Sequence, residues 1–114
     1  MELSKDIDFS DFLKVDIRAG LILRAETFPK AKKPSIKLWI DFGPLGERKS
    51  SAQITKLYNV NDLPGRMILA VCNFPPRQIA DFMSEVLVLG VMEDEETVVL
   101  LQPERNVTPG QRVF

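Results

Sequence analysis

The sequence contains no histidine and a single cysteine. Without histidine, the chain cannot form a Ser-His-Asp or Cys-His catalytic group or a histidine-based zinc site. It also lacks the commonest general base of enzymes. The lone Cys72 cannot form an internal disulfide, and its place in the apolar run ILAVC predicts a small buried hydrophobic residue rather than a nucleophile. These absences argue against many hydrolases and against a disulfide-bonded scaffold.

Long apolar runs and catalytic motifs are also absent. No apolar run approaches the roughly 20 residues that cross a bilayer, and the opening MELSKDIDFSDFLK is acidic rather than apolar. We therefore expect a cytoplasmic protein without membrane insertion. There is no glycine-rich phosphate loop, nucleophile elbow or metal-ligand spacing. The acidic run from Glu93 to Glu96 is contiguous, so its side chains diverge in a turn. We expect neither an enzyme nor a bound cofactor or metal.

Charge is nearly balanced overall but unevenly distributed. The 114 residues carry a net charge of −1 and are enough for one domain with a single core, over residues 1–114. Residues 1–16 hold five acids against two lysines, whereas residues 24–77 hold ten basic residues against four acidic ones. A mixed solvated surface is the ordinary explanation of scattered charge. A basic middle nevertheless suggests an anionic partner.

A period of two dominates the pattern and predicts short strands separated by turn residues. Gly20 interrupts the first strand, where we expect a bulge or bend. MEDEE, at 92–96, predicts an exposed turn. The expected strands cover residues 15–24, 36–41, 48–51, 66–74 and 84–92.

Between the third and fourth strands, the segment SSAQITKLYNVNDLPG predicts a short helix. Ser50 or Ser51 would cap it, and three apolar residues recur at helical spacing: Ile54, Leu57 and Tyr58. Three strands, a helix and two strands is the order of the OB-fold, an all-β, five-stranded, partly open barrel. A small β-barrel of another topology would show the same pattern and remains an alternative.

Two loops of this barrel have side chains suited to nucleic acid. The first, FPKAKKPSIK, has no acid and four lysines: Lys30, Lys32, Lys33 and Lys37. Clustered ammonium groups attract phosphates by releasing counterions from nucleic acid. A solubilising loop would have the same composition, so this motif alone decides little.

The second loop begins with NFPPRQ, and its two prolines stiffen the approach to Arg77. The guanidinium suits a phosphate or a base face, and Asn73 and Gln78 offer amide groups. Phe74 and Phe82 are candidates for stacking under unpaired bases, although packing beneath the loop fits Phe82 better. In an OB-fold, these two loops flank one binding face.

The sequence also resembles a known family. The segments DIRAGLILRAETFPKAKKPSIKLWIDFG, SSAQITKLY and NFPPRQIADFMSEVLVLG are similar to CsaA-like proteins of the tRNA-binding-domain OB-fold family, over residues 12–114. The resemblance implies an OB-fold whose extensions, residues 1–11 and 103–114, build a homodimer. It also implies a tRNA site that includes the lysines of the first loop with Asn73, Arg77 and Ser84.

The chain departs from the wider family at two places. Asp81 stands where glycine is common, and the segment after Ser84-Glu85 differs, so we expect weaker RNA binding. CsaA-like proteins are described as export-related chaperones that bind unfolded preproteins and the export motor SecA. The first hypothesis is therefore a module that binds tRNA or tRNA-like RNA, and the second is a dimeric chaperone for unfolded chains. Apolar clefts for the second would be lined by Phe28, Trp39, Phe74, Phe82 or Met83.

Overall fold

The segment IKLWID has an aliphatic residue at every second position, a pattern that favours a strand with one buried side. The computed structural model, which describes residues 2–114, shows this strand as β2 (Ile36–Asp41). Ile36, Leu38 and Ile40 point into the core, whereas Lys37 and Trp39 lie half-buried on the outer side. The predicted bounds of this strand are confirmed.

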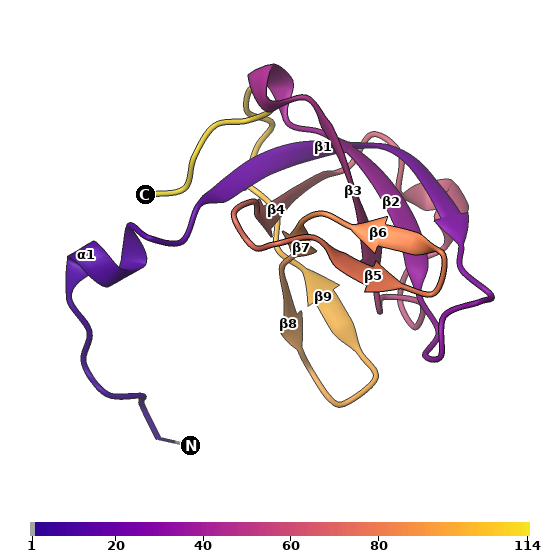
Figure 1. Ribbon diagram of the computed structural model, residues 1–114, viewed down its shortest axis with the longest axis horizontal. Coiled ribbons are helices and arrows are strands. Elements are labelled where there is room, and N and C mark those ends of the chain that lie inside the picture. The colour runs from indigo at the N-terminus through magenta and orange to yellow at the C-terminus, as the bar shows by residue number, and fades with distance from the viewer. Residues whose placement is uncertain (1) are drawn as a thin grey trace.

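Five strands form one antiparallel sheet in the order β3-β2-β1-β4-β7 (Figure 1). The bounds are β1 (Ile17–Thr27), β3 (Glu47–Ala52), β4 (Met67–Val71) and β7 (Leu87–Val88). The sheet curls so that its two ends meet, because the backbone N–H of Glu85, just before β7, donates to the carbonyl oxygen of Lys49 in β3 at 2.8 Å. The predicted all-β OB-type barrel is confirmed. The largest of its fully buried apolar side chains are Ile22, Leu38, Ile40, Phe42, Leu63 and Ile68.

Gly20 does not mark the irregularity expected in the first strand. The shift in β1–β2 register lies between Ile22 and Arg24. A Cβ at Gly20 would lie 2.5 Å from Cγ2 of Ile40 and 2.7 Å from Cε1 of Phe42. Gly20 is therefore required by the close approach of core side chains, a role that a sequence does not separate from a bulge.

The helix predicted between β3 and β4 is much shorter than expected. Only the single 3-10 turn η2 (Val60–Asp62) forms, and its cap is Asn59, whose Oδ1 accepts from the N–H of Asn61 at 3.0 Å. Ser50 and Ser51 instead belong to β3. Tyr58 is held by a distant contact, since its hydroxyl accepts from the N–H of Leu100 at 3.0 Å. Such side-chain hydrogen bonds compete with helix formation.

The predicted fifth strand, residues 84–92, is divided among three partners. β6 (Phe82–Ser84) pairs with β5 (Arg77–Ile79), β7 pairs with β4, and β8 (Gly90–Met92) pairs with β9 (Val98–Leu100). The second basic loop therefore contains a hairpin, β5–β6, which lies over the outer face of the barrel (Figure 1). The acidic run 93–96 forms the expected exposed turn between β8 and β9, closed by Asp94 Oδ1, which accepts from the N–H groups of Glu96 and Thr97 at 2.9 Å.

The two ends of the chain behave differently. The C-terminal segment runs beside β1, where the N–H of Gly110 donates to the carbonyl oxygen of Ala19 at 2.8 Å. The N-terminal segment instead leaves the barrel as an arm, residues 2–13, that includes the short helix α1 (Phe9–Phe12) (Figure 1). A turn of 3-10 helix, η1 (Gly43–Leu45), joins β2 to β3. Within residues 2–114, no helix is both long and apolar enough to cross a membrane.

Candidate nucleic-acid interface

The loop between β1 and β2 and the β5–β6 hairpin lie on the same side of the barrel. The ammonium group of Lys30 reaches across to Asp81 in the hairpin turn, with 2.9 Å between Nζ and Oδ2. Between these segments and β7 is a hollow of about 840 Å³. Five residues that were predicted from the sequence to bind RNA line this hollow: Lys30, Lys32, Lys33, Arg77 and Gln78.

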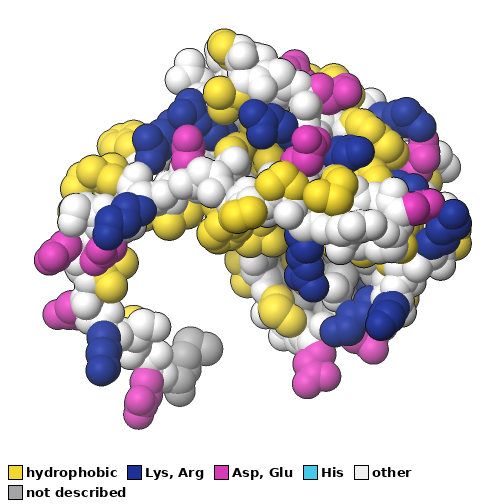
Figure 2. Space-filling model, viewed as in Figure 1, with side chains coloured by type: hydrophobic (Ala, Val, Ile, Leu, Met, Phe, Trp, Pro, Cys, Tyr) yellow, Lys and Arg dark blue, Asp and Glu magenta, His cyan; other side chains and the backbone are white. Residues whose placement is uncertain are grey.

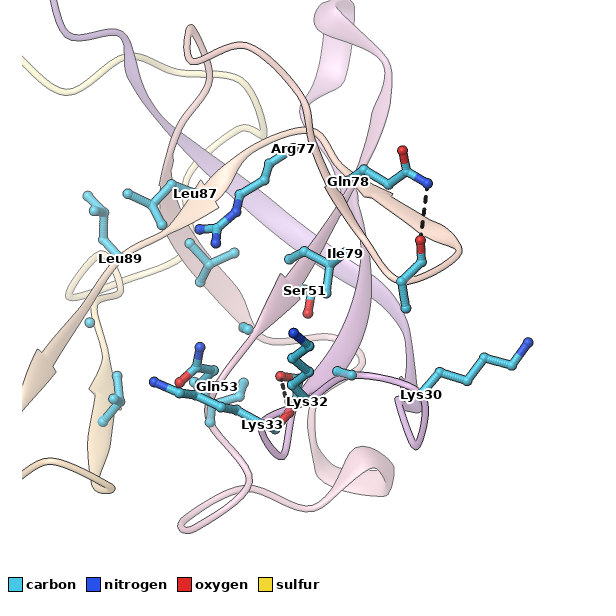
Figure 3. A pocket seen from close by; sticks show the side chains of 18 of the residues that line it. Lys30, Lys32, Lys33, Ser51, Gln53, Arg77, Gln78, Ile79, Leu87 and Leu89 are labelled. Carbon is cyan, nitrogen blue, oxygen red and sulfur yellow. Dashed lines mark hydrogen bonds between the residues drawn. The ribbon is translucent and has the colours of Figure 1, made fainter.

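These five side chains do not all point the same way (Figure 3). Arg77 extends into the hollow toward Leu87, Lys32 rises toward Ser51, and Lys33 lies beside Gln53. Lys30 and Gln78 point outward, and the Gln78 amide donates to the carbonyl oxygen of Ala80 at 3.1 Å. In the described part of the chain, no ion pair involves Lys32, Lys33 or Arg77. Three uncompensated cations therefore converge on this hollow.

The hollow also has an aliphatic wall, and three of its residues come from the segment that the sequence predicted as one buried strand. Five side chains form it: Ile54, Leu87, Val88, Leu89 and Val98. Leu87 is 49% exposed. This wall could not be predicted from the sequence, because a continuous apolar run gives no sign that one side of it faces solvent. The hollow can accept a ligand that has both anionic and apolar parts.

Asp81 does not place a free negative charge in the hollow. The hydrogen bond from Lys30 lowers the pKa of Asp81, and the same bond raises the pKa of Lys30. Asp81 is not among the lining residues. A lowered carboxyl pKa means that the ion pair contributes above the ordinary pKa of aspartate and is lost only as the pH falls through the lowered value. Because the pair is exposed, it contributes little to stability. Its main effect is to neutralise the ammonium group of Lys30, which then attracts a phosphate less strongly.

Lys37 lies apart from this hollow, on a cluster of aromatic rings. Its Nζ is 4.7 Å from the ring centroid of Phe28 and 5.2 Å from that of Phe82. The Phe82 ring meets Phe28 at 5.5 Å and Trp39 at 5.8 Å, edge to face in both cases. Phe28 and Phe82 are buried, so the expectation that Phe82 packs beneath its loop is confirmed. This cluster fixes the hairpin to the sheet by edge-to-face and cation–π contacts.

The other aromatic and apolar candidates are exposed. Phe74 is 52% exposed and lines a second hollow of about 280 Å³. Met83 is 40% exposed and lines neither hollow. Of the residues nominated for a peptide cleft, only Phe74 therefore borders one of these two hollows.

Asn73 and Ser84 make contacts within the protein. The Asn73 side chain accepts from the N–H of Asp16 at 2.9 Å and donates to the carbonyl oxygen of Lys14 at 2.7 Å, which ties the base of the arm to the barrel. Ser84 Oγ accepts from the N–H of Ser51 at 3.0 Å and joins the hairpin to β3. Neither hydrogen bond could be read from the sequence, because each joins segments more than 30 residues apart.

We expect the Ser84→Ala variant to be less stable but nearly unchanged in RNA affinity. It leaves the half-buried N–H of Ser51 without its acceptor, which costs about 1 kcal/mol of unfolding free energy. Urea unfolding and tRNA titration on the same samples measure the two effects, with Thr55→Ala, at an exposed position outside both hollows, as a control. Loss of RNA binding at unchanged stability would instead place Ser84 in contact with RNA.

Similarity to known proteins identifies the family of this chain. The chain matches the model of the family described as "Putative tRNA binding domain" over residues 17–112 and belongs to this tRNA-binding-domain family. Within it the chain is CsaA-like. It is 50% identical to the chaperone CsaA from Bacillus anthracis str. Ames, with a TM-score of 0.93 over 96% of this chain and 100% of that one. For the CsaA chaperone protein from Picrophilus torridus the values are 46% and 0.88, over the same shares.

A longer protein is also similar. The chain is 36% identical over 111 residues to the methionine–tRNA ligase of Porphyromonas gingivalis, a match that covers 97% of this chain. The chain spans only 16% of that ligase's length. The similarity therefore concerns one domain of the ligase.

Proposed function

We propose that this protein is a non-catalytic RNA-binding protein that holds tRNA or tRNA-like RNA at the hollow between the first loop and the β5–β6 hairpin. The observation that carries this proposal is the convergence of Lys32, Lys33 and Arg77, from segments over 40 residues apart, on one hollow without acidic partners. Membership of the tRNA-binding-domain family supports it. Neutralising three phosphates makes binding strongly dependent on salt.

The test is a titration of bulk tRNA at low and moderate salt, with an unfolded polypeptide as competitor. We expect log K to fall with log [salt] at a slope of about −2 to −3, since each neutralised phosphate contributes roughly −0.7 to −0.9. The competitor should not displace the RNA. Absent tRNA binding, or binding that ignores salt, would overturn the proposal.

A second candidate is a chaperone role, in which the hollow binds unfolded preproteins during export with the motor SecA as a partner. The aliphatic wall and the exposed ring of Phe74 favour it, and both solved relatives above are named chaperones. Capture of unfolded chains through apolar contacts would survive salt, which distinguishes it from the first candidate. In either role we expect the protein to act in the cytoplasm.

We further propose that residues 1–114 form a single domain that pairs as a homodimer through residues 1–11 and 103–114. Apolar side chains of these segments lie open to solvent, with Leu3 at 100% and Phe114 at 97% exposure. Figure 2 shows such side chains along the arm and on the barrel beside it. Burial of apolar surface is the main driving force of association. Sedimentation should show a dimer, and a chain lacking residues 2–11 should sediment as a monomer.

Removing the charge of Asp81 should strengthen RNA binding. Asp81→Asn releases Lys30 from its ion pair and makes a fourth cation available to phosphate. We expect a severalfold gain in tRNA affinity at low salt and a slope of log K against log [salt] steeper by about 0.7 to 0.9. Asp62→Asn changes the net charge equally, on η2 outside both hollows, and should leave the slope unchanged. An equal effect of both variants would contradict a local role of Lys30.

A further inference from the structure

The two hollows are adjacent on the surface, and together they are called the trough below. They share four lining residues: Ser51, Arg77, Ile79 and Leu87. The larger part, of about 840 Å³, begins at the first loop, and the smaller part, of about 280 Å³, ends at Phe74 and Pro75. Arg77 borders both parts, and the other residues that line them include lysines of the first loop in the larger part and Phe74 in the smaller part.

We propose that this trough holds an unpaired strand of RNA. One base stacks on Phe74, the phosphate beside it binds Arg77, and the following phosphates bind Lys32 and Lys33. The inference rests on the proposed RNA-binding function and specifies which part of the RNA enters the protein.

The size of the trough selects an unpaired strand. The larger part, of about 840 Å³, lies in the range of pockets for small molecules, about 300–1,000 Å³, which admits individual nucleotides but not a double helix. Double-stranded RNA is bound mostly from outside, by its shape and its backbone, whereas unpaired bases can be splayed out and stacked on side chains. An aliphatic wall beside a row of cations suits a chain that alternates apolar bases with charged phosphates.

The charge of the trough favours RNA over an unfolded polypeptide. Four cations line the larger part and no acid does. The one acid of the smaller part, Glu85, uses Oε1 to accept from the N–H of Lys49 at 3.0 Å. A groove for unfolded chains of varied sequence gains nothing from such a one-sided charge, whereas a polyanion is attracted along its whole length.

Phe74 is suited to stacking because its ring is accessible and its backbone is restrained. The ring is 52% exposed, and Pro75 and Pro76 follow it. Proline fixes its own φ and restricts the residue before it, so little conformational freedom is lost when a base binds. The other candidate for stacking, Phe82, is buried against Phe28 and Trp39 and is not available.

The test compares a fluorescent eight-nucleotide single-stranded RNA of mixed sequence with the same strand annealed to its complement. We expect the single strand to bind at least tenfold more tightly than the duplex. Phe74→Leu should weaken single-strand binding about tenfold, since base–aromatic stacking contributes roughly 1–3 kcal/mol per base. This variant removes no charge, so the salt slope should not change. Leu45→Ala, on η1 outside both hollows, should bind as the unchanged protein does.

Three results would overturn the inference without touching the proposed function, provided that bulk tRNA still binds in a salt-dependent way. They are equal affinity for strand and duplex, no effect of Phe74→Leu, and failure of bulk tRNA to displace the single strand. If bulk tRNA itself does not bind, the proposed function fails and the inference with it. Displacement of the strand by an unfolded polypeptide, independent of salt, would make the trough a peptide site and overturn the inference.

Discussion

Replacing Lys33 and Arg77 together by glutamate should weaken the binding of bulk tRNA about a hundredfold at moderate salt. Hydrogen bonds to charged groups contribute about 1.5–3 kcal/mol each, and losing two of them, about 3 kcal/mol, gives this factor. Both side chains reach the hollow, and no ion pair in the described residues involves them. The reversal should also flatten the salt dependence, because two phosphate contacts disappear. Fluorescence anisotropy across a salt series measures both quantities.

The matched control reverses two cations elsewhere on the surface, Lys56 and Arg24. Their side chains are 59% and 60% exposed, pair with Glu96 and Glu26, and line neither hollow. The two double variants have the same net charge, so a difference between them measures position rather than total charge. Unchanged RNA binding in the Lys33 and Arg77 variant would remove the proposed site. An equal loss in both variants would mean that only the overall charge matters.

Truncating Phe42 to alanine should lower the free energy of unfolding by about 3–5 kcal/mol, the range for large-to-small aromatic substitutions in cores. Phe42 is completely buried, and Gly20 lies against its ring. Because a domain of this size is stable by only about 5–15 kcal/mol, this loss removes a large part of the total. Urea unfolding at one fixed protein concentration is the measurement, since association would otherwise shift the midpoint.

The same pair of residues tests why Gly20 is glycine. Gly20→Ala alone should cost about 1–3 kcal/mol, because its methyl group would overlap Phe42 and Ile40. In the Phe42→Ala background, the methyl group enters space that the ring has left, so the added cost should be smaller. The double variant should therefore lose less unfolding free energy than the sum of the two single losses. Additive effects would show that the contact with Ile40, and not the packing against Phe42, sets the cost of Gly20→Ala.

Much of the barrel could be predicted because its strands have strong local patterns. The alternation in IKLWID gave correct bounds for β2, and the order of strands and turns indicated the OB-fold. The predicted helix was wrong because contacts distant in sequence determine the conformation of this segment. One of them joins the hydroxyl of Tyr58 to the backbone of Leu100. The predicted fifth strand was divided because three consecutive short segments pair with three different strands.

The candidate site, like the fold, could be predicted from the sequence only in part. The composition of the loops indicated that the lysines of the first loop and Arg77 bind RNA, and the structure brings four of these cations to one hollow. Composition alone could not distinguish Lys37 from Lys33. The ammonium group of Lys37 lies over buried aromatic rings, whereas Lys33 reaches the hollow. Nor could composition show that Asn73 and Ser84 have hydrogen-bond partners within the protein. Charge is a property of residue type, but direction depends on what packs beside the residue.

The sequence by itself determined the strand pattern, the basic loops and the family, because local periodicity and residue type are written directly along the chain. Only the tertiary structure decided which cations converge, that Asp81 is paired with Lys30, and that the segment after β6 exposes an aliphatic wall. Each of these depends on the curling of the sheet, which brings β3 against Glu85 and sets the hairpin over the outer face of β2. The physical reason is that a side chain's partners are fixed by closure of the barrel, and closure joins residues that lie far apart in the sequence.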